Sequence, residues 1–202
     1  MLRVEQLCCA RGPRELFRDL SFSAAAGDAV IVTGPNGSGK TTLLRALAGL
    51  TLPVSGAIRW NDSRQGLAAK RAYLGHAAGW KESFSVTENL RFAWQLDAET
   101  AANDEGAVSA ALERVGMARQ RNLSVGRLSQ GQKKRLHLAR LSRSTRPLWL
   151  LDEPGAALDG EGLDILADVV AAHLRQGGIA AIATHQPLAI AAARTHNVAL
   201  GG

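Results

Sequence analysis

The stretch Gly34-Pro35-Asn36-Gly37-Ser38-Gly39-Lys40-Thr41 decides the fold. It matches the phosphate-binding loop pattern at every fixed position. Its glycines allow backbone N–H groups to turn inward around phosphate oxygens, at φ values that other residues resist. We expect Lys40 to reach the β- and γ-phosphates of ATP and the Thr41 hydroxyl to bind Mg²⁺, so ATP and Mg²⁺ are the predicted ligands.

The segments on either side fit such a loop. Ala29–Thr33 is a short apolar run that ends in glycine, the pattern of a strand buried on both faces. Thr41–Leu50 predicts a helix with one apolar face, and the positive N-terminal end of that helix would point at the same anion. Thr42, in its first turn, belongs to the predicted nucleotide site. A chance glycine turn would not have both flanks.

Two acidic residues follow a second apolar strand. Leu148–Leu151 is continuously apolar and leads into Asp152 and Glu153. Asp152, at the carboxyl end of the strand, is expected to hold Mg²⁺ through water. Glu153 is expected to accept a proton from the water that attacks the γ-phosphate. An acidic helix start would give the same pattern, but the phosphate loop in the same chain favours the catalytic interpretation.

The rest of the chain alternates strands and helices around one helical stretch. Strands are predicted at 2–7, 16–22, 57–60, 72–75 and 179–183, and a helix at 160–175. Residues 87–141 show helical spacing without a strand signal. Strands separated by helices imply a parallel sheet. We predict one α/β domain over 1–202, with a nucleotide-binding core at about 1–85 and 146–202 and a helical subdomain at about 86–145.

Three further motifs carry a family resemblance. Leu128-Ser129-Gln130-Gly131-Gln132, followed by Arg135, resembles the signature motif of the ATP-binding-cassette (ABC) ATPases. Ala157-Leu158-Asp159 resembles the loop that links the two sites in that family, and Thr184-His185 resembles its switch histidine. With the phosphate loop they occur in the family's order over nearly the whole chain. The resemblance implies a P-loop NTPase fold: a RecA-like parallel sheet, an N-terminal antiparallel β subdomain and an inserted helical subdomain.

The resemblance also implies a head-to-tail homodimer that encloses two ATP molecules. Each site would combine the phosphate loop of one copy with Ser129, Gly131 and Gln132 of the other. A serine donor at a helix N-terminus suits a γ-phosphate. His185 would contact the γ-phosphate and position water, so Glu153, His185 and Lys40 are the expected catalytic residues.

The chain departs from the family pattern at three positions. His76 stands where the family has a glutamine that senses Mg²⁺, and a neutral imidazole there would still contact Mg²⁺-bound water. Arg11 stands where an aromatic residue stacks on adenine, and its guanidinium plane would take that place. Gln130 replaces a glycine.

The same sequence resembles one group within the family, the ATP-binding subunits of cytochrome c maturation and haem export. The residues that carry this are Leu74-Gly75-His76, Trp80-Lys81, Glu88-Asn89-Leu90, Thr184–Leu188 and the opening Leu7–Arg11. The resemblance implies integral membrane subunits as partners and release or transfer of a haem-loaded chaperone. It also implies a peripheral place on the cytoplasmic side of the bacterial inner membrane. These partners would bind the surface around His76–Trp94. Trp80 and Phe84 would be either exposed there as apolar anchors or packed inside the helical insert.

The charge of the chain gives a further indication of its partners. The net charge is +6 and the sequence pI is near 10.0, which favours anions without choosing among them. Lys133-Lys134-Arg135 would suit nucleic acid, but it falls on the signature helix, so we expect a solvated helix face and no nucleic-acid partner. His137, His173 and His196 are interpreted as surface or helix residues.

No segment predicts a membrane anchor or a disulfide. No apolar stretch reaches the roughly 18–20 residues that span a bilayer, and Arg3 and Glu5 interrupt the start too early for a signal peptide. Cys8 and Cys9 are neighbours whose side chains alternate across a strand, so we expect two reduced thiols in the cytoplasm.

Two other kinds of protein share part of this pattern. A soluble ABC ATPase that acts on ribosomes or DNA would have every motif, as would a subunit for another substrate. Ribosome and DNA ATPases of this type usually carry a second cassette or a long coiled-coil insertion. A nucleotide kinase would share only the phosphate loop and would have no use for residues 128–132.

Overall fold

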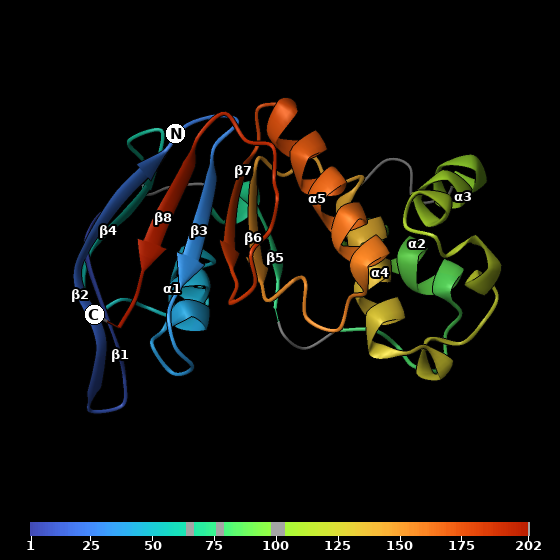
Figure 1. The fold of residues 1–202 in the computed structure, drawn as a ribbon, viewed down its shortest axis with the longest axis horizontal. Coiled ribbons are helices and arrows are strands. Elements are labelled where there is room, and N and C mark those ends of the chain that lie inside the picture. Colours follow the sequence, from blue (N-terminus) through green and yellow to red (C-terminus); the bar gives the residue numbers. More distant parts are fainter. Residues whose placement is uncertain (64–66, 76–78, 98–103, 202) are drawn as a thin grey trace. The chain divides into compact units, whose positions relative to one another are not determined.

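The structure, a computed structural model, describes residues 1–202 except 64–66, 76–78, 98–103 and 202 (Figure 1). The chain forms two compact units. We call Met1–Gly75, Arg146–Pro154 and Val170–Gly202 the sheet unit, and His76–Thr145 with Gly155–Val169 the helical unit.

The sheet unit contains β1 (Leu2–Arg11), β2 (Arg14–Ala24), β3 (Ala29–Thr33), α1 (Lys40–Leu47), β4 (Ser55–Trp60), the short 3-10 helix η1 (Leu67–Lys70), β5 (Arg71–Leu74), β6 (Leu148–Asp152), β7 (Ile179–Ala183) and β8 (Thr195–Ala199). The helical unit contains α2 (Val86–Leu96), α3 (Glu105–Arg114), η2 (Ala118–Gln120), η3 (Val125–Arg127) and α4 (Gln130–Leu141). The helix α5 (Gly160–Arg175) begins in the helical unit and ends in the sheet unit.

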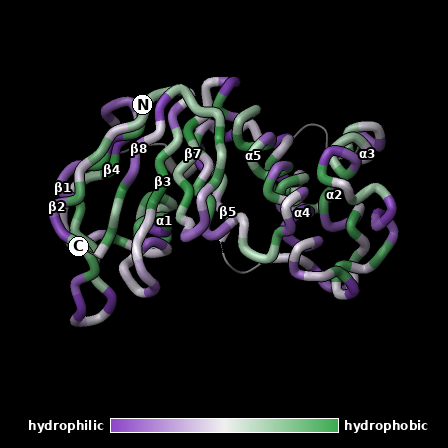
Figure 2. The backbone as a smooth tube through the Cα atoms, viewed as in Figure 1, coloured by the Kyte–Doolittle hydropathy of each residue, from purple (hydrophilic) through white to green (hydrophobic). Residues whose placement is uncertain are grey.

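The sheet unit is built from two sheets. β2, β1 and β4 form an antiparallel sheet in that order, and β5, β6, β7, β3 and β8 form a parallel sheet. Every residue of β6 and β7 is buried, which explains their continuously apolar sequences, and Figure 2 shows β3 and β7 as hydrophobic. The predicted parallel core is therefore confirmed.

One large core joins the elements of the sheet unit. It collects buried side chains from both sheets and from α1, whose Leu43, Leu44 and Leu47 are fully buried. Each such leucine stabilises the fold by about 1.5–3 kcal/mol through burial. The helix α1, which follows the phosphate loop, is thus held against the core by its apolar face, opposite its polar residues.

The sequence interpretation missed one core strand. We took Ile179–Ala183 as the last strand of the core, but β8 follows it and pairs with β3 in parallel. Only Val198 of β8 is buried, because β8 lies at the edge of the sheet. Its Thr-His-Asn-Val-Ala sequence therefore has no apolar run that would mark a strand.

Side-chain caps define the helices of the helical unit. Ser85 caps α2 in a capping box: its Oγ accepts the Glu88 N–H, and a Glu88 carboxylate oxygen accepts the Ser85 N–H. The buried Asn89 fixes the preceding loop, because its side-chain amide lies 2.9 Å from both the N and the O of Lys81. Trp94 is fully buried and donates to the Arg140 carbonyl oxygen.

Two further expectations concern thiols and membranes. Cys8 and Cys9 are both free and buried, as expected for neighbours in β1. Burial raises the pKa of the Cys9 thiol to about 11, so this thiol stays protonated at neutral pH. Among the described residues, no helix combines the length and the apolar character needed to cross a bilayer.

Candidate functional site

The phosphate loop connects β3 to α1 and is held in shape by three left-handed glycines. Gly34, Gly37 and Gly39 have φ of 145°, 82° and 106°. At Gly34 the need for glycine is also steric, since a Cβ would lie 2.4 Å from the Leu200 carbonyl oxygen. Leu200, directly after β8, therefore leaves no room for a side chain at Gly34, and its N–H donates to the Thr33 carbonyl oxygen (2.9 Å).

The loop presents hydrogen-bond donors that fit a phosphate chain. Gly39 caps α1 without a side-chain hydrogen bond, so no side chain satisfies the first N–H groups of the helix. The buried Lys40 ammonium donates to the carbonyl oxygens of Gly34 (2.7 Å) and Pro35 (3.1 Å). Within the described part of the chain, the buried Ser38 hydroxyl has no hydrogen-bond partner. These groups fit a bound polyphosphate.

A pair of oxygen donors lies next to this loop. Thr41 Oγ1 lies 3.2 Å from Oδ1 of Asp152, which is 2% exposed at the end of β6. Burial, and then the negative charge of Asp152, raise the pKa of Tyr73 on the neighbouring strand β5. A hydroxyl and a carboxylate together are hard oxygen ligands of the kind that Mg²⁺ prefers. His76, the third predicted metal residue, lies outside the described residues.

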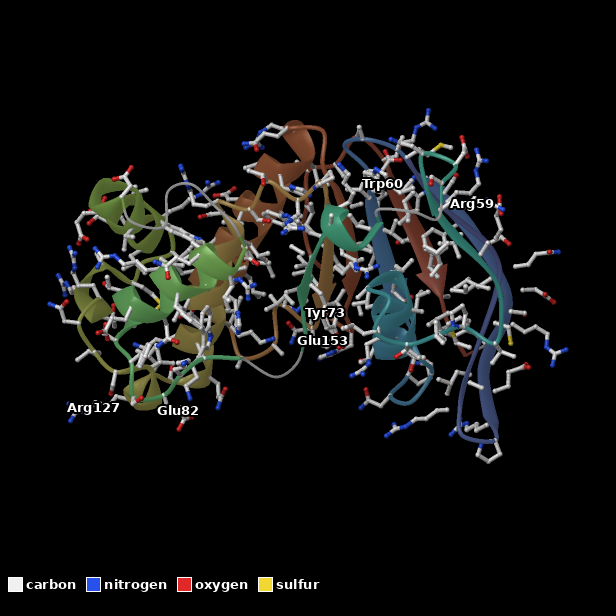
Figure 3. All side chains as sticks on the ribbon, turned by 180° about the vertical axis from the view of Figure 1, so that it is seen from behind. Arg59, Trp60, Tyr73, Glu82, Arg127 and Glu153 are labelled. Carbon is white, nitrogen blue, oxygen red and sulfur yellow. The ribbon has the colours of Figure 1, made fainter. Side chains whose placement is uncertain are left out.

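Glu153 and His185 form a hydrogen-bonded pair just beyond the ends of β6 and β7. Glu153 Oε2 lies 2.9 Å from His185 Nδ1, and Figure 3 shows Glu153 beyond the end of β6. Glu153 adopts φ of 48°, unusual for a residue other than glycine, while its N–H donates to the Ala183 carbonyl oxygen (2.9 Å). The turn aims the carboxylate away from the strand. Only 19% of the Glu153 side chain is exposed, against 58% for His185.

Lys40, Thr41 and Glu153 line a common cavity. A cavity of about 240 Å³ is bounded by Arg11, by Leu16, by the loop and the first turn of α1, and by Glu153. Arg11, at the end of β1, lines this cavity, and its stacking on adenine stays a prediction. Leu16 was missed, because a lone apolar residue in an alternating strand carries no signal of a ligand contact.

In the helical unit, the predicted signature residues begin α4. Ser129 is the N-cap: its Oγ accepts the Gln132 N–H (3.1 Å), and Gln132 Oε1 accepts the Ser129 N–H (2.9 Å). This use leaves the Ser129 O–H as a donor. Gly131 packs against the linking loop, where a Cβ would lie 2.7 Å from the Ala157 carbonyl oxygen.

The basic run on α4 is not the solvated face that we expected. Only 11% of the Arg135 side chain is exposed, and its guanidinium pairs with Asp159 (2.7 Å) and Glu161 (2.9 Å). The hydrogen bonds that Arg135 donates to Glu161 and to Asp159 raise the pKa of its guanidinium, although burial lowers it. No local sequence pattern predicts these pairs, because the partners are more than twenty residues away.

A cavity beside Arg135 is lined by both the signature motif and the linking loop. About 520 Å³ in volume, it is lined by Gly116, Met117, Gln120, the signature residues 129–132, Arg135 and the linking-loop residues 157–159. The two sequence motifs predicted to meet the partner copy therefore border one cavity within the helical unit.

The three histidines outside motifs are more buried than a surface interpretation implies. His137 in α4 and His173 in α5 are 6% and 7% exposed and stack on Trp80 and Trp149, with ring centroids 4.4 and 3.9 Å apart. His196 lies in a strand, β8, and its Nε2 is 2.9 Å from the buried Asp28 carboxylate. Helix assignments for His137 and His173 are confirmed, whereas His196 lies on an edge strand with 32% of its side chain exposed, so only the helix alternative fails for it.

The two aromatic residues proposed as anchors differ in exposure. Phe84 is 37% exposed, whereas Trp80 is half-buried against His137. Other exposed apolar side chains of the helical unit are Phe92 (36%), Leu96 (69%) and Leu123 (41%). The Lys81 ammonium lies over the Phe84 and Phe92 rings, 5.1 and 4.8 Å from their centroids.

Comparisons with known proteins agree with one another. A family model described as ABC transporter matches residues 17–156. The cytochrome c biogenesis ATP-binding export protein CcmA of Rhizobium meliloti is 47% identical to this chain, over 96% of the chain and 95% of that protein.

Two solved structures share the fold. One, described as an ABC transporter ATP-binding protein of Pyrococcus furiosus, has a TM-score of 0.86 at 24% identity and covers 98% of this chain and 96% of its own. The other is the dimeric post-hydrolysis state of the ATP-binding cassette MJ0796 bound to ADP and Pi. It has a TM-score of 0.78 at 19% identity and covers 92% of this chain and 88% of its own.

Proposed function

The chain belongs to the ABC transporter family, in the group of the cytochrome c biogenesis ATP-binding export proteins, and on that premise we propose how its residues hydrolyse ATP. It is the ATP-hydrolysing subunit of an export system for cytochrome c biogenesis. The observation that supports the chemistry best is the Glu153–His185 pair beside a phosphate loop. Membership in this group disfavours a ribosome- or DNA-associated ATPase and a nucleotide kinase.

The phosphate loop binds the triphosphate of ATP. The N–H groups at the start of α1, including those of Thr41 and Thr42, donate to phosphate oxygens. The Lys40 ammonium exchanges its carbonyl partners for the β- and γ-phosphates. Thr41 and Asp152 would hold Mg²⁺, which would neutralise phosphate charge, and His76 stays the third predicted metal residue.

Glu153 is the general base of hydrolysis. A water molecule attacks the γ-phosphorus while its proton passes to a Glu153 carboxylate oxygen, and the bond between that phosphorus and the bridging oxygen to the β-phosphate breaks. ADP and inorganic phosphate are the products. The hydrogen bond from His185 holds the carboxylate in one direction, so the proton acceptor is fixed before the water arrives.

A second copy completes each site. Ser129, Gly131 and Gln132 of one copy meet the γ-phosphate bound by the other, with the Ser129 O–H as donor. Two observations support this arrangement: the serine keeps that donor while it caps α4, and a structural relative is a dimer with ADP and Pi bound.

Integral membrane subunits bind the exposed apolar patch of Phe84, Phe92, Leu96 and Leu123. Aromatic side chains at the centre of a patch are typical anchors of protein interfaces. The hydrogen bonds of Asn89 to Lys81 hold the loop before α2, which carries Phe84. The chain would then be peripheral on the cytoplasmic face of the inner membrane and would drive release or transfer of a haem-loaded chaperone.

Glu153→Gln tests the proposed chemistry. The amide keeps the shape but accepts no proton, so phosphate release by the complex with its membrane subunits should fall at least about 100-fold. ATP affinity should persist, and size-exclusion chromatography with MgATP should show a trapped dimer. Glu113→Gln, the same change at an exposed position of α3, is the control and should leave turnover unchanged. Normal phosphate release by Glu153→Gln would remove the residue from this role.

A further inference from the structure

Two residues that follow β8 lie against the phosphate loop. β8 lies beside β3 at the edge of the parallel sheet (Figure 1), with Ala199 in register with Thr33. Because the two strands are parallel, the next residue along each is again a neighbour, which places Leu200 beside Gly34. Leu200 is 4% exposed and belongs to the core of the sheet unit. Packing in the core thus fixes the point from which the chain continues along the loop.

Leu200 meets the loop with its backbone carbonyl group. A Cβ at Gly34 would lie 2.4 Å from the Leu200 oxygen and 2.6 Å from the Ser38 hydroxyl oxygen, so these two oxygens flank Gly34 together. Only a residue without a side chain fits between them, and its φ of 145° is one that glycine adopts readily. The start of the loop therefore lies directly against the backbone that follows β8.

Gly201 meets the loop one residue further along. A Cβ at Gly201 would lie 3.2 Å from Ser38 Cβ and 3.4 Å from Pro35 Cδ, closer than the roughly 3.5–4.0 Å at which carbon atoms attract best. Pro35 and Ser38 carry a hydrogen bond within the loop, from the Ser38 N–H to the Pro35 oxygen (3.2 Å). The same oxygen accepts from the Lys40 ammonium (3.1 Å). A side chain at 201 would therefore push on the part of the loop that holds Lys40.

We propose that Leu200 and Gly201 are positioning residues of the phosphate loop, which hold it in the conformation that binds a polyphosphate. Neither residue is among the described residues that line the cavity between the loop and Glu153, so both act through the loop and not on the nucleotide. The donors of a loop bind a phosphate well only when they are already aimed at it, so a small displacement lowers affinity. The inference rests on the proposed function, because it requires the loop to bind the phosphates of ATP.

Gly201→Asn tests the proposal, with Gly177→Asn as its matched control. The two glycines have similar φ values, 88° and 84°, in the region that asparagine enters more readily than most residues. A Cβ at Gly177, after α5, would meet nothing closer than Ala26 Cβ at 3.9 Å, an ordinary contact. The two variants thus add the same side chain at nearly the same φ, and only Gly201→Asn presses on the phosphate loop.

Calorimetric titration of the full chain with MgADP measures the difference. Gly201→Asn should weaken MgADP binding about tenfold, whereas Gly177→Asn should bind it as the unmodified chain does. Urea unfolding without nucleotide should shift the midpoints of the two variants equally, which separates loop position from stability. In the complex with its membrane subunits, Gly201→Asn should raise the KM for ATP and leave kcat nearly unchanged, because Glu153 and His185 are intact.

Substitutions of Leu200 extend the test to the first of the two residues. Leu200→Ala leaves space in the core below the backbone that touches Gly34, so it should also weaken MgADP binding. Leu200→Met fills a similar volume and should restore the affinity of the unmodified chain. Should either Gly201→Asn or Leu200→Ala not fold, the other variant decides.

Two results would overturn this proposal alone. One is unchanged or tighter MgADP binding in Gly201→Asn, and the other is an equal loss of affinity in Gly177→Asn, which would assign the effect to backbone strain in general. Failure of the unmodified chain to bind MgADP would instead overturn the phosphate site and, with it, the proposed function.

Discussion

The two units begin their key helices in opposite ways. In the sheet unit α1 starts at Gly39, in a left-handed conformation with φ of 106° and no side-chain cap. In the helical unit α4 starts at Ser129, whose extended conformation and capping box with Gln132 satisfy the helix end from within. The N-cap of α1 satisfies none of the first N–H groups with a side chain, whereas side chains satisfy two of them at the start of α4.

The two units also differ in net charge. The sheet unit has 13 Lys and Arg residues against 7 Asp and Glu, whereas the helical unit has 11 of each, so the net charge of +6 belongs to the sheet unit. A basic unit with open N–H groups is suited to hold a polyphosphate. A neutral unit in which the Ser129 O–H remains available as a donor is suited to bind that phosphate when it is present.

The sharpest test of this comparison is Ser129→Ala. We expect phosphate release by the complex with its membrane subunits to fall about 100-fold, the cost of removing one donor to a developing negative charge. Loss of the cap should also lower the free energy of unfolding by about 1 kcal/mol. The two effects are measured by phosphate release and by urea unfolding.

Ser85→Ala is the matched control for that variant. Ser85 caps α2 with the same φ of −64° and ψ of 164° and the same capping box. It should lose the same 1 kcal/mol or so and keep its turnover. Equal losses of turnover in the two variants would mean that Ser129 acts only through helix stability.

The second test concerns the N-terminal end of α1, which has no side-chain cap. Saturation with MgADP at about 100 times its Kd should stabilise the sheet unit by about 2.7 kcal/mol. Amide hydrogen exchange should then slow at Thr41 and Thr42, which gain phosphate acceptors, but not at Gln132, whose N–H already bonds to Ser129. Equal protection of both helix ends would contradict the comparison.

The smallest effect concerns a feature that the units share. Each has a buried histidine stacked on a tryptophan, and burial lowers the pKa of His137 to about 3 and of His173 to about 4. For His173 a hydrogen bond to the Ile179 carbonyl oxygen opposes this shift. Between these values and the ordinary 6.5, the unfolded chain binds protons that the folded chain does not. Stability should therefore be complete above pH 6.5 and fall as the pH drops below it.

Replacement of each histidine by phenylalanine separates the two contributions. Each variant should lose about 2 kcal/mol of the difference between urea unfolding at pH 7.5 and at pH 5. His137→Phe should cost least at pH 7.5, because the described residues give His137 Nδ1 no hydrogen-bond partner. An unchanged pH profile in either variant would show that its histidine titrates normally in the folded chain.

The sequence predicted the fold class well because its signals are local. The P-loop NTPase class with a parallel sheet, an antiparallel β subdomain and helices of the ABC type is confirmed. The apolar runs of β3, β6 and β7 and the glycines at 34, 37 and 39 each act within a few residues. β8 was missed because an edge strand buries one residue and needs no apolar run.

Pairings between distant residues could not be predicted in the same way. The signature resemblance pointed to Arg135, but its ion pairs with Asp159 and Glu161 depend on how α4 packs beside the linking loop. The Glu153–His185 hydrogen bond likewise depends on the pairing of β6 with β7, which brings the ends of the two strands together. The roles of these residues stay predictions until the variants above are measured.

The close contact of Gly131 with the Ala157 carbonyl oxygen limits how this domain can be recombined. Ala157 has a left-handed φ of 66°, which turns that oxygen into the space where a side chain at 131 would stand. The stretches 128–132 and 155–159 are thus sterically coupled. A chimera that exchanges either stretch for that of a distant homologue has to exchange the other as well.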